Sequence, residues 1–119
     1  MIEEELYEHL KLLGIDVYPQ KAKDNAKTPY LTYSLVFGQP KQMPSGDISF
    51  VKSSWQIDVF EESSLKAKML RDRVVESIRD FPSYSSGLSY RDGYEERVKV
   101  YRQIIEFYTK ENTGECNGN

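Results

Sequence analysis

The chain contains 119 residues, of which 39% are hydrophobic and 29% charged, and its formal net charge is −3. This length predicts one domain, because most domains contain about 100–150 residues, and the composition excludes a disordered or fibrous chain. The acidic balance argues against a nonspecific nucleic-acid binder, which needs a basic surface for phosphate contacts.

The sequence carries no signal for a membrane or for export. No apolar run approaches the roughly 18 residues that a membrane-spanning helix requires. The acidic residues 1–5 lack the basic region of a signal peptide, so none is expected. The single cysteine, Cys116, has no partner for an internal disulfide, which fits a reducing compartment.

The first predicted element is a helix over residues 2–13, followed by a short strand over residues 15–18. Apolar side chains recur at helical spacing on one stripe, formed by Ile2, Leu6, Leu10 and Leu13. Glutamates occupy the first turn, where the helix dipole favours negative charge. Gly14 is suited to end the helix, because glycine readily adopts a positive φ at that position.

Two longer strands are predicted over residues 30–37 and 48–60. Alternation along the first strand places four apolar side chains on one face: Leu31, Tyr33, Leu35 and Phe37. Along the second strand, one face carries Trp55, Ile57 and Val59. These two faces are predicted to pack against the helices.

A polar stretch, residues 38–47, separates these strands and predicts a mobile hairpin loop. The strand after it opens with apolar residues on the opposite parity from Trp55, which indicates either a β-bulge or a strand base that a neighbouring subunit buries. We therefore expect the loop and the strand base to form a protein interface. Its predicted residues are Gln39, Lys41, Gln42, Met43, Ile48 and Phe50.

The second half of the chain predicts a helix over residues 63–80, capped by Ser63 or Ser64. Its core stripe consists of Ala67, Leu70, Val74 and Ile78. Two strands follow, over residues 84–91 and 98–109, joined by a tight turn at Asp92-Gly93. The terminal strand is apolar on both faces, which indicates either a central strand covered twice or a face for a partner.

These elements predict an α+β fold in which two helices pack on one face of a small, mainly antiparallel β-sheet. The predicted order is α-β-β-α-β-β, with an extra short strand after the first helix. Residues 1–110 form a single domain in this interpretation. Residues 111–119 show no periodicity and are expected to be a flexible polar tail.

No residue is predicted to be catalytic, to hold a cofactor or to ligate a metal. His9 is the only histidine and no nucleophile motif accompanies it, so a solvated helix histidine is expected. Cys116 stands alone, whereas a zinc site needs several cysteine or histidine ligands. Asp58 and Glu61 could form a general-acid pair, but solvated charges explain both residues. The scattered glycines match no phosphate-binding loop.

Tyrosines and basic residues alternate in the last third of the chain. An aromatic and basic sheet can stack single-stranded bases, yet acidic residues are interleaved with these and reduce the positive charge. Tyrosine and arginine are also enriched at protein–protein interfaces, which is the function favoured here. The predicted interface residues in this region are Tyr94, Arg97, Tyr101 and Arg102.

Several short motifs occur in a defined order along the chain. The first two are the acidic helix start Ile-Glu-Glu-Glu-Leu at residues 2–6 and Gly-Ile-Asp-Val-Tyr-Pro at residues 14–19. Thr-Pro-Tyr-Leu-Thr-Tyr follows at residues 28–33, and Trp-Gln-Ile-Asp-Val-Phe at residues 55–60. The last are a helix that starts at Ala-Lys, residues 67–68, then Tyr-Arg at residues 101–102 and Ile-Glu-Phe at residues 105–107. In this order and spacing, over residues 2–109, they resemble the tail-completion or tail-terminator proteins of long-tailed bacteriophages and prophages.

The resemblance implies a structural role and a fold of helices packed on a small antiparallel sheet. Such proteins form a six-fold ring that caps the head-proximal end of the tail tube, ends its polymerisation and offers the surface that joins the head. The implied partners are further copies of the chain, the tail tube protein and a head connector or stopper protein. No membrane and no nucleic-acid contact is required. The implied location is the head–tail junction of the virion, and the host cytoplasm during assembly.

Other functions stay open from the sequence. They are another head–tail connector component, a small single-stranded nucleic-acid-binding module and, with the least support, an enzyme subunit.

The distribution of charge bears on the ring, because a ring needs two different contact patches on each subunit. Residues 1–16 hold five acids against one lysine, a net of −4, and residues 17–60 hold five lysines against three acids, a net of +2. An acidic helix against a neighbour's basic loop is one candidate seam, and two solvated surfaces are the alternative.

Overall fold

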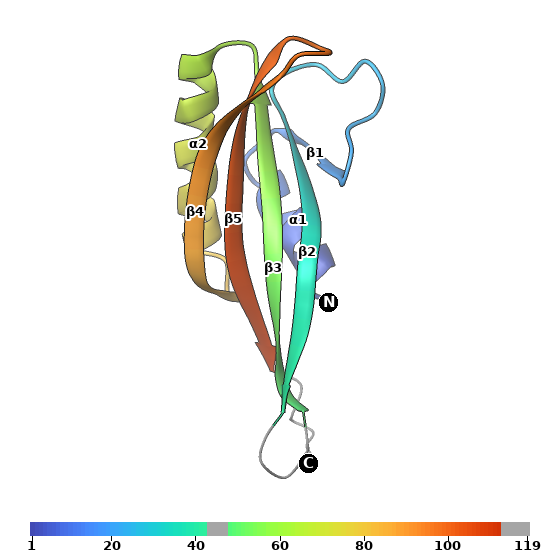
Figure 1. The fold of residues 1–119 in the computed structure, drawn as a ribbon, viewed down its shortest axis with the longest axis vertical. Coiled ribbons are helices and arrows are strands. Elements are labelled where there is room, and N and C mark those ends of the chain that lie inside the picture. The colour runs from blue at the N-terminus through green and yellow to red at the C-terminus, as the bar shows by residue number, and fades with distance from the viewer. Residues whose placement is uncertain (43–47, 113–119) are drawn as a thin grey trace.

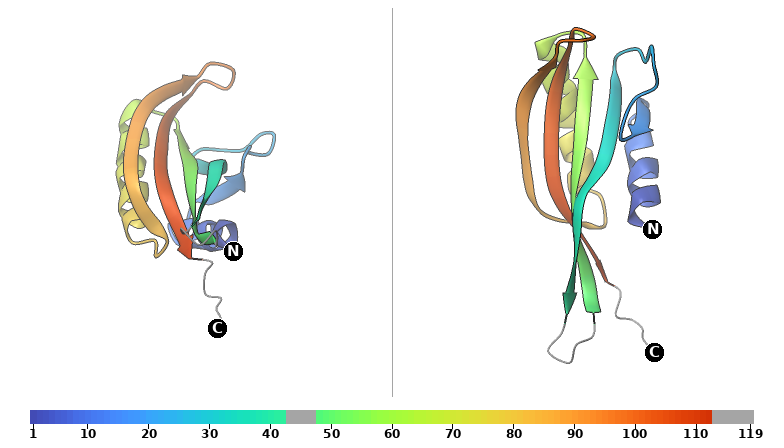
Figure 2. Two further views of the ribbon diagram at one scale, coloured as in Figure 1. Left: turned by 60° about the horizontal axis from the view of Figure 1, so that its bottom comes forward. Right: turned by 45° about the vertical axis from the view of Figure 1, so that its right-hand side comes forward.

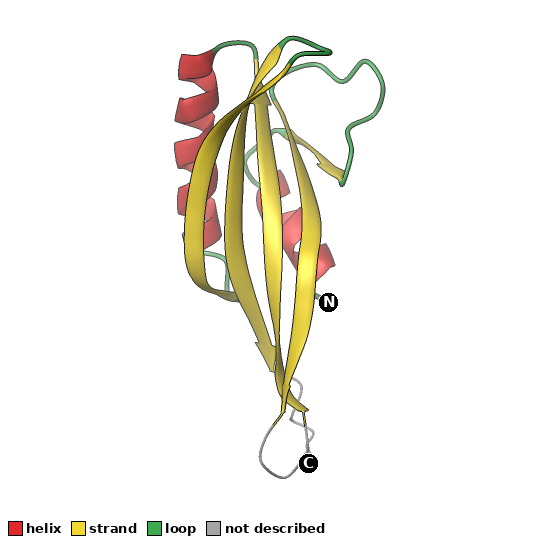
Figure 3. Ribbon diagram, in the orientation of Figure 1, coloured by secondary structure: helices red, strands yellow, loops and turns green. Residues whose placement is uncertain are grey.

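The computed structural model describes residues 1–42 and 48–112. Its elements are α1 (Ile2–Lys11), β1 (Asp16–Pro19), β2 (Tyr30–Gln42), β3 (Ile48–Glu61), α2 (Ser64–Arg79), β4 (Tyr84–Glu95) and β5 (Val100–Asn112). Two helices and one five-stranded sheet confirm the predicted α+β class and element order, with β1 as the extra short strand (Figure 3). Because β5 runs to Asn112, the start of the predicted polar tail belongs to a strand, and the rest of that tail lies outside the described residues.

The sheet has the strand order β1-β2-β3-β5-β4 (Figure 1). β1 and β2 run parallel, whereas the pairs β2–β3, β3–β5 and β4–β5 are antiparallel, which confirms a mainly antiparallel sheet. Both helices lie on the same side of the sheet (Figures 1 and 2), and none of the described helices covers the other side. We call that uncovered side the open face.

The helices begin and end close to the predicted positions. α1 ends at Lys11, and Gly14 follows it with a φ of 77°, as expected for a helix stop. The Ser63 hydroxyl caps α2 by accepting a hydrogen bond from the backbone N–H of Lys66 at 3.1 Å. Neither described helix has the length and apolar character needed to cross a membrane.

The core lies between the two helices and the sheet. Ten residues predicted to meet there are buried in one cluster: Leu6, Leu10, Leu31, Tyr33, Trp55, Ile57, Val59, Leu70, Val74 and Ile78. The helical stripes and most of the alternating strand positions are therefore assigned to the correct faces. Leu35 and Phe37 are the exceptions, because their side chains are 52% and 45% exposed.

A β-bulge in β2 explains where the predicted face breaks down. Leu35 pairs with Trp55 and Phe37 pairs with Ser54, so Val36 is an extra residue without a partner in β3. One extra residue moves every later side chain to the opposite face of the sheet. Phe37 therefore lies on the open face, with its ring centroid 6.2 Å from that of Tyr108, and not on the face of Leu31 as predicted.

The predicted loop over residues 38–47 is largely a pair of strands. Residues 38–42 of β2 pair with residues 48–53 of β3, and this hairpin arm extends beyond both helices (Figures 1 and 2). Only residues 43–47 remain between the strands, outside the described residues. Pairing of β3 with β5 is regular from Phe50 to Glu61, so Phe50 stays on the face opposite Trp55 and no bulge corrects its phase there.

The hairpin of β4 and β5 turns later than predicted. Asp92 and Gly93 lie within β4, where they pair with Gln103 and Arg102, and the chain reverses at residues 96–99. The turn propensity of the Asp-Gly pair is overridden by its pairing with the adjacent strand. β4 also contains Gly87, whose φ is 73°, and a Cβ there would overlap the ring of Tyr108.

Candidate functional site

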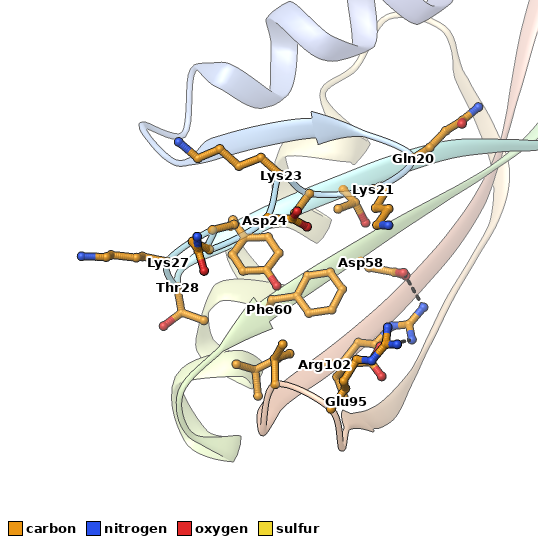
Figure 4. Close-up of a pocket in the computed structure, with 18 residues that line it drawn as sticks. Gln20, Lys21, Lys23, Asp24, Lys27, Thr28, Asp58, Phe60, Glu95 and Arg102 are labelled. Carbon is orange, nitrogen blue, oxygen red and sulfur yellow. Dashed lines mark hydrogen bonds and ion pairs between the residues drawn. The ribbon is translucent and has the colours of Figure 1, made fainter.

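A groove of about 700 Å³ lies on the open face, at the end of the sheet opposite the hairpin arm (Figure 4). The loop between β1 and β2 forms one wall, and the β4–β5 turn forms the other. Strands β2, β3 and β5 form the floor. Its lining consists of residues 20–28, Tyr30, Thr32, Asp58, Phe60, Glu95, Arg97, Val98, Val100 and Arg102.

The pairing of the strands places the floor residues side by side. Tyr30 and Arg102 are both direct partners of Phe60, one on each side of β3. The rings of Tyr30 and Phe60 stack with centroids 4.7 Å apart, and Tyr18 meets Tyr30 edge-on at 6.0 Å. The floor is therefore a rigid aromatic surface at the end of the sheet.

An ion pair lies beside these rings. Arg102 Nη2 donates to Asp58 Oδ2 at 2.6 Å, and the Gln56 amide donates to Asp58 Oδ1 at 3.0 Å. The Asp58 side chain is only 9% exposed, so the expectation of a solvated strand carboxylate is wrong. The alternative of a general-acid pair with Glu61 does not fit the strand either, because Glu61 lies on the opposite face of β3 by strand alternation.

Arg102 is held from several directions but is not fully satisfied. Its Nη1 lies 3.7 Å from Glu95 Oε2, and its guanidinium carbon lies 5.6 Å from the centroid of the Phe60 ring. Its buried Nε atom has no hydrogen-bond partner among the described residues. A buried donor without a partner costs free energy, so the Nε atom is a local cost of holding Arg102 in this position.

The groove carries net positive charge. Five cations line it (Lys21, Lys23, Lys27, Arg97 and Arg102) against three carboxylates (Asp24, Asp58 and Glu95), a net of +2. In the described part of the chain, Arg102 is the one cation of these five that forms an ion pair, and the three loop lysines are exposed. The combination of cations at the rim and aromatic rings on the floor suits an acidic ligand that also has an apolar part.

Burial also changes the acidity of the groove tyrosine. The pKa of Tyr30 is raised above its usual value of 10.0, mainly because burial disfavours the phenolate and secondarily because Glu95 lies nearby. Tyr30 therefore stays a neutral hydroxyl-bearing ring at physiological pH.

His9 lies away from this groove and is not the solvated helix residue that was predicted. It is half-buried between α1 and α2, where its Nε2 donates to the Ser77 carbonyl at 2.7 Å and its ring lies 5.2 Å from Phe81. It lines a second cavity of about 320 Å³ with Arg73 and Glu76, among others. No group of three or more metal-ligating side chains occurs within residues 1–42 and 48–112.

The structure separates the predicted interface residues into two regions at opposite ends of the sheet. Gln39, Lys41 and Phe50 belong to the hairpin arm, with Gln42 and Ile48 at its strand ends, and Met43 lies outside the described residues. At the other end are Tyr94, Arg97, Tyr101 and Arg102, of which Arg97 and Arg102 line the groove. Tyr94 and Tyr101 contact each other, with ring centroids 5.0 Å apart.

Sequence reasoning did not identify the groove. Tyr30, Asp58 and Phe60 are predicted only as strand residues, and the lysine-rich loop only as one side of a candidate seam between subunits. The signal that could have found them is the shared parity of Asp58 and Phe60 together with three lysines in one short segment. Arg102 joins them only through the pairing of β3 with β5, which the sequence does not state.

No family model matches the chain, and no curated protein matches it. By contrast, 25 chains of solved structures do match. One of these, whose name states no function, superposes with a TM-score of 0.61 and 13% sequence identity over 95% of this chain and 94% of its own length. At that identity the similarity shows a shared fold alone: an α+β domain with two helices on one face of a mainly antiparallel sheet.

Proposed function

We propose that the protein is a structural subunit of the tail-terminator type, which assembles as a ring on the head-proximal end of a bacteriophage or prophage tail tube. In this role it ends tube polymerisation and provides the surface for joining the head. Its function lies in contact surfaces rather than in a catalytic pocket. The order of motifs along the chain is the starting point, and the hairpin arm is the structural observation that carries the proposal.

The arm is suited to contact another protein. It extends beyond the helices, so no described helix covers either of its faces (Figure 2). Three consecutive apolar side chains at the bulge are exposed: Leu35 at 52%, Val36 at 51% and Phe37 at 45%. Consecutive exposed apolar residues are typical of interaction surfaces. We assign the tail tube to this contact, because the arm is the part of the subunit that reaches furthest from its core.

The test uses the tail tube protein encoded in the same genome. Tubes polymerised in the presence of the protein should be short and carry a ring at one end, visible by negative-stain electron microscopy. Tubes of unchanged length with bare ends would contradict the proposal.

A matched pair of variants locates the contact. Leu35→Ser with Phe37→Ser changes two exposed apolar residues at the base of the arm and should abolish capping. Leu65→Ser with Met69→Ser changes two apolar residues on α2 that are even more exposed, at 70% and 61%, and should leave capping intact. Equal capping by both variants would show that the arm is not the contact.

A further inference from the structure

We propose that the groove on the open face receives the acidic first turn of α1, residues Glu3, Glu4 and Glu5, from a second copy of this chain. The contact is heterologous, since each subunit offers the groove on one side and the helix on the other. This inference rests on the proposed function, because it names the seam between neighbours in the ring.

Charge complementarity is the first argument. Glu3, Glu4, Glu5 and Glu8 are all exposed on α1, and within the described residues their one ion pair joins Glu4 to the N-terminal ammonium of Met1 at 3.9 Å. The groove presents the opposite charge, and its Lys21, Lys23, Lys27 and Arg97 form no ion pair within the described chain. Each patch therefore offers the charge that the other needs, and their contact would be strengthened as water is excluded.

The position of the two patches supports a contact between copies rather than within one. α1 packs on the helical side of the sheet, whereas the groove opens on the open face (Figures 1 and 4). The sheet itself lies between them, so a subunit cannot place its own first turn in its own groove. Two different patches on opposite sides generate a head-to-tail arrangement, which closes into a ring when the rotation between neighbours permits.

The groove lining also provides apolar surface for Met1, the residue at the start of the acidic turn. Met1 lies directly before the acidic turn and its side chain is 77% exposed. A methionine side chain packs well against apolar surface, and Val98, which is 56% exposed, offers such surface in the lining, whereas Tyr30 and Phe60 are 8% and 7% exposed. The volume of about 700 Å³ is within the range that accommodates several side chains.

Charge reversal tests the seam by sedimentation velocity at low and high salt, without tail tubes. Lys23→Glu with Lys27→Glu should weaken self-association about tenfold or more, because like charges then face each other. Glu4→Lys with Glu5→Lys should do the same. The two sets combined in one chain should restore association to near the wild-type level. A control of equal charge change on α2, Lys68→Glu with Arg79→Glu, should leave it unchanged.

Disulfide trapping supplies a second readout in a Cys116→Ser background. Protein with Glu4→Cys, mixed with protein with Lys27→Cys, should give the mixed dimer in clear excess over either homodimer. A statistical mixture, no dimer at all, or no rescue by the combined charge reversal would overturn the inference. So would tight binding of a single-stranded oligonucleotide that Lys23→Glu with Lys27→Glu abolishes, because the groove would then serve nucleic acid.

The outcomes separate this inference from the proposed function. Variants that lose the trapped dimer but still cap tail tubes would place the ring seam elsewhere and leave the function standing. Variants that show the trapped dimer and its charge rescue without any effect on tubes would leave the seam standing and contradict the function.

Discussion

Asp58 and Arg102 illustrate how single residues anchor the floor of the groove. Asp58 accepts from Arg102 and from Gln56, and its side chain is almost completely buried. Removing one member of such a pair leaves the other desolvated without its partner. The ion pair therefore fixes the geometry of the groove floor. Its effect on the free energy of unfolding is measured by removing one partner.

Replacing Asp58 by alanine should lower the free energy of unfolding by on the order of 1–3 kcal/mol, because the Arg102 guanidinium loses its main acceptor in a partly buried site. Asp58→Asn retains an acceptor oxygen of the same shape and should cost less. Urea unfolding followed by tryptophan fluorescence measures both. An alanine variant as stable as the wild type would show that the ion pair contributes nothing to the fold.

Because of Tyr30, the free energy of unfolding should depend on pH in the alkaline range. Its raised pKa means that the folded state holds the phenolic proton more tightly than the unfolded chain does. The resulting stability is fully present below the unfolded pKa of 10.0 and is lost as the pH rises through the higher folded value. Tyr30→Phe keeps the stack on Phe60 and removes the titration, so its unfolding free energy should fall less steeply above pH 10. Denaturant melts between pH 8 and about 11 test this, and parallel wild-type and variant curves would contradict it.

At the scale of the elements, the core depends on helix stripes meeting alternating strand positions. Ile57 and Leu70 are buried at 0% and 5% exposure, whereas Leu65 on the same helix as Leu70 is 70% exposed. This contrast provides an internal control, since the same substitution can be made on both sides of one helix.

Leu70→Ala or Ile57→Ala should each lower the free energy of unfolding by about 2–5 kcal/mol, the range for large-to-small changes in a packed core. Leu65→Ala should change it by less than about 0.5 kcal/mol, as for an exposed site. Thermal and urea unfolding of the three variants gives the comparison. Losses below about 0.5 kcal/mol at both core sites would mean that the core face is wrongly assigned.

The elements also show which parts of the fold a sequence can predict. Periodicity identified both helices, all the strands and nearly the whole core, because each of those signals is local. Periodicity did not predict the β-bulge at Val36. The extra residue lies within the apolar run Leu35-Val36-Phe37, so the later side chains move to the other face of the sheet while the sequence there stays apolar. The prediction failed again at Asp92-Gly93, because pairing with β5 outweighs a local turn preference. The groove was missed for a related reason: Asp58, Glu95 and Arg102 meet only through strand register.

On the scale of the whole molecule, the two candidate contact regions, the arm and the groove, lie at opposite ends of the sheet. The Cα positions extend over 52 × 25 × 22 Å, so the subunit is elongated along its strands. The groove and α1 are suited to contacts between neighbouring subunits, whereas the arm reaches away from both helices (Figure 1). In the function proposed above, this division would let one subunit join its neighbours around a ring and contact a tail tube at the same time.

Excising the arm tests that division directly. Gly38 and Ser53 are direct partners in the β2–β3 pairing, so residues 39–52 can be replaced by a two-residue Asn-Gly turn of the type that closes tight hairpins. Because none of the core residues between the helices and the sheet is removed, the shortened protein should fold cooperatively. It should retain the charge-dependent association through the groove and lose the ability to cap tail tubes. Circular dichroism, sedimentation and electron microscopy follow the three properties separately. Normal capping by the shortened protein would show that the arm is only a spacer, and loss of association together with capping would show that the two contacts are not independent.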